Sequence, residues 1–449
     1  MKIAFHTLGC KVNQYETEAM AALFRQQGHV IVGETEFADV YVINTCTVTA
    51  VADRKSRQYI RRMKKINPDS VIAVTGCYAQ IMPDEVASIE GVDIVTGTNE
   101  KGTIPAYVEE FLQRRREKEA RGIAEADAVQ RRIHPYEELG TYEDTGIVTS
   151  AENRTRAYIK VQDGCNRFCS YCVIPYARGP VRSRPPEEIR EEAVRLIASG
   201  YRELVLTGIN TALYGADKGM DLGIEHVIAS LDALPGEFRI RLSSLEPTVV
   251  NADQVRRLFA YDRLCHHLHL SAQSGSDRVL AAMARRYDVR EYLQIVDAVR
   301  GFDPQYGLST DIIAGFPSET EADLADSISL IERACFCKTH VFRYSPRPKT
   351  LAAQMEDQID PAVKAQRSDA LQTAGAKAAE RFFMENKGKV RTALFEEFLE
   401  DGWLTGYTDN YIRVYVPCGK EKAEHLLNEF AEIRLTDIYR DGMRGETGI

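Results

Sequence analysis

Short apolar runs alternate with longer helical patterns over most of the chain, and this alternation limits the possible folds more than any other feature. In residues 1–117 the apolar runs KIAFHT, DVYVINT and SVIAVTG are separated by YETEAMAALFRQQG and RKSRQYIRRMKKI. Repeated strand and helix patterns of this kind predict βα units and a parallel sheet. The first region is therefore expected to fold as a parallel α/β domain.

The alternation resumes between about residues 155 and 347. Six runs have the pattern of strands: RAYIKVQ, RELVLTG, RIRLSSL, HHLHLSA, GLSTDIIAG and THVFRYS. An eightfold barrel built from such units needs about 250 residues. Six repeats in this shorter region predict an open (β/α)6 barrel.

The remaining segments separate and close these regions. Residues 114–146 are charged and nearly without aliphatic periodicity, which indicates a helix end followed by a connecting segment. After about residue 387, short strand-like pieces with DG and DN turns are typical of a small all-β module. The predicted parts of this α/β chain are 1–117, a linker 118–150, a barrel domain 151–375, and a connecting helix with the β module 376–449.

Composition restricts the setting of the protein. Hydrophobic residues make up 44% of the chain, and no run approaches the roughly 20 apolar residues of a membrane span. Met1 leads into an apolar triplet without a signal-peptide pattern, so we expect a cytoplasmic protein without membrane contact. Disulfides do not persist in a reducing compartment, so the ten cysteines are expected to be core residues, metal ligands or catalysts.

Charge allows only a local nucleic-acid surface. The formal net charge of −9 argues against nucleic-acid binding over the whole protein. Residues 54–65, RKSRQYIRRMKK, nevertheless contain seven basic residues in twelve, and NYIRVYVP carries Tyr411, Arg413 and Tyr415. Both segments are hypothetical RNA contacts, and for the basic helix an ordinary solvated face is the alternative.

Three cysteines directly follow the first predicted barrel strand. Cys165, Cys169 and Cys172 have the spacing C-x3-C-x2-C and lie where such barrels place their catalytic loops. Structural zinc needs four ligands, so zinc is an incomplete alternative here. A [4Fe-4S] cluster on three thiolates leaves one iron open for a substrate or cofactor. The spacing therefore favours an iron-sulfur cluster.

Three further cysteines stand at equivalent places in the N-terminal region. Cys10, Cys46 and Cys77 each come just after a predicted strand. The carboxyl ends of parallel strands share one edge of the sheet, where open α/β sheets bind ligands. Three buried core cysteines are the alternative. We interpret them as a second three-cysteine cluster site.

Two segments carry a family resemblance. QDGCNRFCSYCVIPYARGPVRSRP and TLGCKVNQYETEAM resemble the radical S-adenosylmethionine methylthiotransferases, specifically the bacterial branch acting on N6-threonylcarbamoyladenosine in tRNA. The resemblance covers essentially the whole chain. It implies an N-terminal methylthiotransferase domain, a radical S-adenosylmethionine barrel and a C-terminal, OB-like TRAM module. It also implies two [4Fe-4S] clusters on the two cysteine triplets and S-adenosylmethionine as cofactors.

The resemblance implies a reaction and its partners. Reductive cleavage of S-adenosylmethionine at the barrel cluster gives methionine and a 5′-deoxyadenosyl radical, which abstracts hydrogen from C2 of the modified adenine. The N-terminal cluster delivers the sulfur, and a second S-adenosylmethionine provides the methyl group. The expected partners are tRNA carrying N6-threonylcarbamoyladenosine just 3′ of the anticodon, and an electron donor such as flavodoxin or ferredoxin.

Six further residues are candidates for binding S-adenosylmethionine: Tyr171, Thr207, Asn210, Ser243, Ser244 and Glu246. The resemblance places Tyr171, between two cluster cysteines, near the adenine. Thr207 and Asn210 stand where many radical enzymes have a Gly-Gly-Glu motif for the methionine amino group. The other three follow the third barrel strand and are expected at the ribose or carboxylate, with a turn or helix cap as the alternative.

Two alternatives to this function stay open. One keeps the chemistry and changes the substrate to an isopentenyladenosine in tRNA or to a ribosomal protein. The other is a non-enzymatic zinc or iron-sulfur protein that binds RNA. The motifs GCKVN and PYARGPVR favour the threonylcarbamoyl branch.

Overall fold

The computed structural model describes residues 1–449 apart from 124–127, 144–154, 221–222, 248–249 and 448–449. The chain forms two compact units, each assembled from several segments. The first contains Met1–Ala151, Gln162–Arg184 and Ser345–Ala353, and the second contains Glu152–Val161, Pro185–Tyr344 and Gln354–Ile449. The predicted domain limits stay a prediction, and parts of the predicted linker and of the start of the barrel domain lie outside the described residues.

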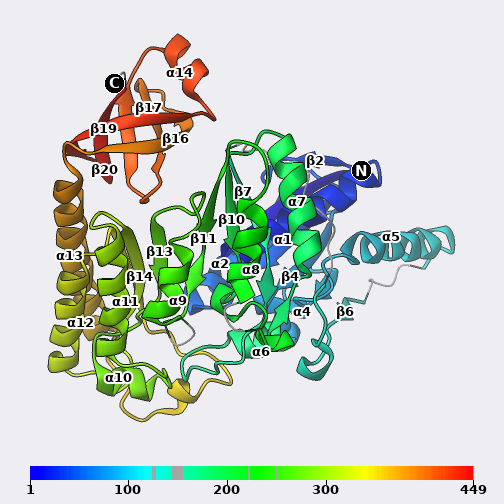
Figure 1. Ribbon diagram of the computed structural model, residues 1–449. Coiled ribbons are helices and arrows are strands. Elements are labelled where there is room, and N and C mark those ends of the chain that lie inside the picture. The colour runs from blue at the N-terminus through cyan, green and yellow to red at the C-terminus, as the bar shows by residue number, and fades with distance from the viewer. Residues whose placement is uncertain (124–127, 144–154, 221–222, 248–249, 448–449) are drawn as a thin grey trace. The chain divides into compact units, whose positions relative to one another are not determined.

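A six-stranded parallel sheet forms the centre of the first unit (Figure 1). In spatial order its strands are β2 (Val30–Val32), β1 (Lys2–Thr7), β3 (Val40–Thr45), β4 (Val71–Gly76), β5 (Ile94–Thr96) and β6 (Gln130–Arg132). The central strands β3 and β4 are buried over their whole length, as in parallel sheets covered on both faces. This confirms the predicted parallel α/β fold. Strand β6, inside the predicted linker, was not expected.

Helices cover both faces of this sheet. They are α1 (Lys11–Gln26), α2 (Ala50–Ile66), α3 (Cys77–Ile81), α4 (Pro83–Ala87), α5 (Ile104–Ala120) and the short η1 (Tyr136–Glu138). Alternate strand residues enter two separate cores, since successive side chains of a strand point to opposite faces. One core holds Phe24 of α1 and Phe111 of α5, and the other holds Ile60 of α2 and Val86 of α4.

Two short segments from later in the sequence complete the first unit. The first contains β8 (Gln162–Asp163), α6 (Ile174–Arg178) and β9 (Arg182–Ser183), with β8 and β9 paired antiparallel. The second ends in η4 (Leu351–Gln354), and its Arg347 binds Thr47 at 2.6 Å and Asp53 at 2.5 Å. The first unit therefore joins parts of the chain almost 300 residues apart in sequence.

An open parallel barrel forms most of the second unit (Figure 1). Its strands are β7 (Arg156–Lys160), β10 (Glu203–Thr207), β11 (Arg239–Leu242), β12 (Ser244–Leu245), β13 (His267–Leu270), β14 (Gly307–Ala314) and β15 (Lys338–Arg343). They follow one another in chain order, with β11 paired to β10 and β12 paired to β13. Because β11 and β12 continue one strand, the barrel has the predicted six strand positions.

Helices connect these strands. They are α7 (Pro186–Ala198), η2 (Thr211–Leu213), η3 (Ala216–Lys218), α8 (Gly223–Asp232), α9 (Ala252–Leu258), α10 (Asp277–Ala282), α11 (Val289–Phe302), α12 (Glu321–Ala334) and α13 (Pro361–Asn386). Helices α9, α11 and α12 begin at side-chain caps, Asn251, Asp288 and Thr320, each part of a capping box. In the described part of the chain, no helix has the length and apolar character needed to cross a membrane.

The C-terminal module is a closed five-stranded barrel, as predicted. Its elements are β16 (Val390–Phe398), β17 (Trp403–Thr408), β18 (Arg413–Pro417), α14 (Lys420–Leu426), β19 (Phe430–Tyr439) and β20 (Gly442–Thr447), with strand order β16-β17-β18-β20-β19. Its core is continuous with Phe382 and Phe383 of α13. The long helix therefore anchors the module.

The turn between β17 and β18 lies against the amino end of the parallel barrel. The carbonyls of Tyr407 and Thr408 accept from Arg239 at 3.0 Å and from Arg241 at 3.2 Å. Tyr411 stacks on His267, the first residue of β13, with ring centroids 4.3 Å apart. Arg239 and His267 are the first residues of β11 and β13. The module therefore covers the end of the barrel at which these strands begin.

This arrangement corrects one sequence-based hypothesis. Tyr415 is buried, and the ring of Tyr411 contacts His267, Tyr407 and the guanidinium of Arg241. Neither tyrosine presents a free face to a nucleobase. The hypothesis of RNA contact through these two rings is therefore wrong, because Tyr411 packs against the parallel barrel and Tyr415 is buried within the C-terminal module beside Asp441 and Tyr439.

Candidate active site

Both cysteine triplets lie in the first unit. The N-terminal triplet stands on the loops after β1, β3 and β4, and the barrel triplet stands on the segment between β8 and α6. Cys77 is buried, Cys10 is exposed, and the other four thiols are half-buried. The six predicted ligands thus share one compact unit although 162 residues separate the first from the last in the sequence.

Glycines shape the backbone at three of these cysteines. Gly9, Gly76 and Gly164, each directly before a cysteine, have φ of 116°, 98° and 70°. A Cβ on Gly9 would lie 3.2 Å from the Sγ of Cys46, so the loops of Cys10 and Cys46 approach closely. Only glycine adopts such φ values without strain. The repeated Gly-Cys pairs therefore fix the directions of the loops that carry the thiols.

The N-terminal thiols influence one another electrostatically. Burial, together with the nearby Cys77 and Cys10, raises the pKa of Cys46 to about 12. Burial also raises the pKa of Cys77, whereas the positive charges of Arg178 and Lys101 lower it. Thiolates are the metal-binding form, so loading this triplet releases protons.

The barrel triplet lies on a loop with firm backbone anchors. The amide of Cys165 donates to the carbonyl of Gly179 at 3.0 Å, and the amide of Cys172 donates to the carbonyl of Cys169 at 2.9 Å. A Cβ on Gly164 would lie 1.8 Å from the carbonyl oxygen of Pro180. Backbone contacts with Gly179 and Pro180 therefore hold the loop. Its path does not depend on the thiols.

The chemistry of the two thiol sets fits iron-sulfur clusters, because such clusters are held by cysteine thiolates. Three thiolates would leave one iron of each cluster open to another ligand. Among the described residues, no group of three or more His, Cys, Asp or Glu side chains is arranged to hold a metal ion.

Arg178 links the two triplets through buried hydrogen bonds. Its guanidinium is fully buried and donates to the two carboxylate oxygens of Glu16 at 2.8 and 3.2 Å. It also donates to Asp163 at 3.1 Å and to Oδ1 of Asn13 at 2.6 Å. Lys101, equally buried, lies 3.0 Å from Glu16. One cation of the barrel loop is thus held by residues of the N-terminal domain.

Two of these partners reach the cysteine loops. Asn13 donates to the carbonyls of Leu8 and Thr45, at 2.7 and 3.0 Å, just before the first two N-terminal cysteines. Asp163 accepts from the amide of Gly164 at 2.8 Å, just before the first barrel cysteine. Sequence reasoning missed this network. Its only signals were the polar residues of CKVNQYE and the arginine of YARGP.

We expect Arg178→Gln to lower the iron bound at the N-terminal triplet and to destabilise the first unit. Removing one partner of a buried ion pair costs about 3–5 kcal/mol, and here it also frees Asn13 from its guanidinium partner. Iron content after anaerobic reconstitution and the thermal unfolding midpoint measure the two effects.

A matched control is Arg241→Gln in the second unit. Arg241 is also buried and binds buried Glu203 through two nitrogens, at 2.9 and 3.0 Å. This control should lose comparable stability and keep its iron, and Arg178→Lys should recover part of the iron. Equal iron in the Arg178 and Arg241 variants would contradict the linking role.

The candidate S-adenosylmethionine residues of the barrel lie at strand ends in the second unit. Thr207, Asn210, Ser243 and Glu246 are buried, and Ser244 is half-buried. Asn210 donates to Glu246 at 2.7 Å. A sixth barrel residue of this polar group, Arg285, donates to the other oxygen of Glu246 at 3.1 Å and was not predicted. Their role in binding S-adenosylmethionine stays a prediction.

Ser243 supplies an argument that this edge takes a polar ligand. Its hydroxyl is buried and has no hydrogen-bond partner within the described residues. Leaving such a group unpaired costs about 1–3 kcal/mol. The residue set therefore fits a polar ligand such as S-adenosylmethionine. Tyr171 belongs to the first unit, where it is half-buried between Cys169 and Cys172.

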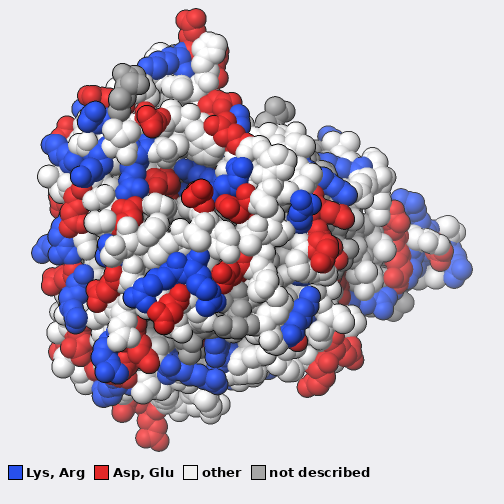
Figure 2. Space-filling model, viewed as in Figure 1, with Lys and Arg blue, Asp and Glu red and all other residues white. Residues whose placement is uncertain are grey.

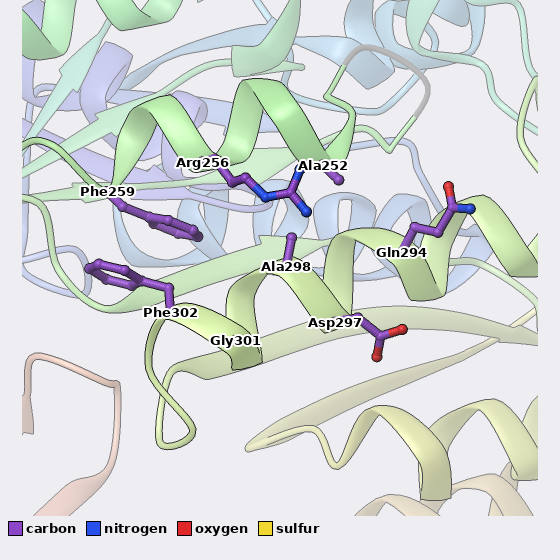
Figure 3. A pocket seen from close by; sticks show the side chains of 8 residues that line it. All are labelled: Ala252, Arg256, Phe259, Gln294, Asp297, Ala298, Gly301 and Phe302. Carbon is purple, nitrogen blue, oxygen red and sulfur yellow. The ribbon is translucent and has the colours of Figure 1, made fainter.

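A separate pocket lies between α9 and α11, outside this site (Figure 3). The rings of Phe259 and Phe302 stack at one end with centroids 4.1 Å apart, and Arg256 and Asp297 line the remainder. It contains no thiol and lies among the helices around the barrel. It contributes nothing to the cysteine sites.

Comparisons with known proteins agree with this architecture. Residues 2–97 match the Uncharacterized protein family UPF0004, and residues 159–331 match the Radical SAM superfamily. The chain is 41% identical over 417 residues to the threonylcarbamoyladenosine tRNA methylthiotransferase MtaB of Bacillus subtilis, covering 92% of this chain and 89% of that protein. It is 32% identical over 449 residues to the tRNA-2-methylthio-N(6)-dimethylallyladenosine synthase of a Thermoanaerobacter species, covering 98% and 91%.

A solved structure supports the fold. The radical S-adenosylmethionine methyltransferase TsrM from Kitasatospora setae, with cobalamin and a [4Fe-4S] cluster bound, is similar with a TM-score of 0.58 and 15% identity. The match covers 78% of this chain and 77% of that one, and at this identity it concerns the fold alone. The superfamily match confirms S-adenosylmethionine and iron-sulfur clusters as cofactors. With relatives more than 30% identical over nearly its whole length, the chain belongs to the radical S-adenosylmethionine methylthiotransferases.

Proposed function

We propose that this protein converts N6-threonylcarbamoyladenosine in tRNA, just 3′ of the anticodon, to its 2-methylthio derivative. The observation that carries the proposal is the difference between its relatives. Identity is 41% to a threonylcarbamoyladenosine enzyme and 32% to a dimethylallyladenosine enzyme, each over more than 90% of this chain. Both relatives are named for methylthiolation of an adenosine in tRNA. The higher sequence identity to the first favours the threonylcarbamoyl substrate.

The residues divide the work between two sites. Cys165, Cys169 and Cys172 hold the cluster that, when bound, supplies an electron to cleave S-adenosylmethionine. The polar strand ends at Asn210 and Glu246 orient that molecule, because both side chains are fixed by their mutual hydrogen bond. Cys10, Cys46 and Cys77 would hold the second cluster, which would supply the sulfur.

Partners and setting follow from this chemistry. The electron comes from a low-potential donor such as flavodoxin or ferredoxin, because iron-sulfur centres span roughly −700 to +450 mV and this cleavage needs the low end. We infer a cytoplasmic setting from a tRNA substrate and a donor of this kind.

Dimethylallyladenosine in tRNA is the second candidate substrate, supported by 32% identity over 98% of the chain. A ribosomal protein substrate gains no support from these relatives, whose names all specify tRNA. Membership of an enzyme family removes the hypothesis of a non-enzymatic RNA-binding protein.

A host strain lacking the gene should lose 2-methylthio-N6-threonylcarbamoyladenosine from its tRNA and keep the unthiolated precursor. Mass spectrometry of digested tRNA nucleosides measures both. Wild-type protein should restore the product, and a variant without the barrel cysteines should not. Loss of the methylthiolated dimethylallyl nucleoside instead would assign the chain to the second substrate.

A further inference from the structure

One helix surface in the first unit carries positive charge alone. Helix α2 has a single acidic residue, Asp53, which is buried and bound to Arg347 at 2.5 Å. Its exposed basic residues, here called the α2 surface, are Arg54, Lys55, Arg61, Arg62 and Lys65. None of their side chains forms an ion pair or a hydrogen bond with another residue in the described part of the chain.

Other basic residues of this protein are arranged differently. On the same helix, Arg57 binds Glu85 at 2.7 Å and Lys64 lies 3.7 Å from Asp93. On the face drawn in Figure 2, Lys and Arg side chains are interspersed with Asp and Glu side chains. In a chain of formal net charge −9, an all-basic helix face is an exception.

The five charges form two rows. At about 100° per residue, Arg54, Arg61 and Lys65 fall within about 20° of one line along the helix. Lys55 and Arg62 form a second row on the adjacent side. The first row extends over about 16 Å at 1.5 Å per residue. Like charges on neighbouring turns repel one another, so the fold gains no stability from this pattern.

The rows begin beside the N-terminal cysteine triplet. Helix α2 starts at Ala50, capped by the side chain of Thr49, four residues after Cys46. Val48, just before the helix, and Val51, in its first turn, are exposed by 52% and 50%. A polyanion bound along α2 would thus end at the apolar patch of Val48 and Val51, a few residues from the candidate cluster ligand Cys46.

We propose that the α2 surface binds the phosphate backbone of the substrate tRNA, with the anticodon arm leading toward Val48 and Cys46. The proposal rests on the proposed function. The repeated phosphates of an RNA backbone match two rows of unpaired cations. An acidic protein matches them less well, because its surface charges are mixed with apolar and basic groups. The apolar patch would contact a nucleobase close to the thiols.

The test uses the full-length reconstituted protein and tRNA that carries N6-threonylcarbamoyladenosine. The variant Arg61→Gln with Lys65→Gln removes two charges of the first row. Its control, Arg116→Gln with Arg121→Gln, removes two exposed charges from the end of α5, where acidic residues alternate with basic ones. Affinity is measured over a range of KCl concentrations.

We expect the α2 variant to bind tRNA more weakly and to show a log–log salt dependence about two units shallower, nearly one for each lost phosphate contact. The α5 control should keep the wild-type slope. Charge removal from a self-repelling row should leave the thermal midpoint unchanged or higher, so weaker binding would not reflect unfolding.

Three other outcomes would overturn the proposal. An unchanged slope in a variant that still methylthiolates tRNA would reject the α2 surface and leave the proposed function standing. A wild-type protein that does not bind this tRNA would reject the proposed function itself. Weaker binding of a flavodoxin-type donor with unchanged tRNA binding would assign α2 to the electron donor.

Discussion

Replacement of Cys165, Cys169 and Cys172 by alanine together should halve the iron of the reconstituted protein and abolish 5′-deoxyadenosine formation. Two clusters correspond to about eight irons per chain, and this variant can hold only the N-terminal four. The loop should keep its shape, because Gly164 and the backbone of Gly179 hold it independently of the thiols. Iron and sulfide assays, with chromatography of the S-adenosylmethionine products, measure both effects.

Cys418→Ala provides the control for this triple substitution. Cys418 is a half-buried thiol of the C-terminal module, outside both triplets. It should keep full iron and full cleavage. Continued 5′-deoxyadenosine formation by the barrel triple variant would remove these three residues from the radical site.

Replacement of Cys10, Cys46 and Cys77 by alanine should have the complementary effect. Cleavage of S-adenosylmethionine should remain measurable, because the barrel cysteines keep their own anchors, whereas methylthiolation should stop because no sulfur-bearing cluster remains. The iron content should again fall by half. Quantifying 5′-deoxyadenosine and the methylthiolated nucleoside in the same reaction separates the two functions.

The structure identifies a possible confounding effect and its control. Cys77 packs with Val173 and Ala177 of the barrel loop, so its replacement by alanine also removes buried surface. Cys77→Ser loses less side-chain volume than alanine does and replaces the thiol by a hydroxyl. If the Ser variant binds half the iron and fails to methylthiolate, the loss comes from the ligand. Sulfur insertion by the triple variant would make these thiols structural.

The strands and their order could be predicted from the sequence, because local apolar patterns encode them. The apolar runs VYVINT and VIAVTG correspond to β3 and β4 almost residue for residue, because a central parallel strand must be apolar on both faces. The ends of β1, β3 and β4 then indicated where Cys10, Cys46 and Cys77 lie, since parallel strands of one sheet share an edge. The same periodicity predicted the six strand positions of the open barrel.

Long-range contacts of polar residues could not be predicted in the same way. Arg178 lies in a short polar loop, and nothing local indicates that it binds Glu16, 162 residues earlier. Tyr411 was interpreted as an RNA contact because aromatic and basic residues alternate around it, whereas its partner is His267. In both cases a side chain gets its role from a segment distant in sequence.

The turn between β17 and β18 also determines when the barrel can be finished during protein synthesis. Translation yields all six barrel strands before residues 407–411 exist, so the nascent Arg239 and Arg241 lack the carbonyl groups that bind them in the finished protein. An emerging chain thus keeps a charged, open barrel end until its last module has left the ribosome. A nonsense mutation in that module would therefore damage the catalytic barrel itself.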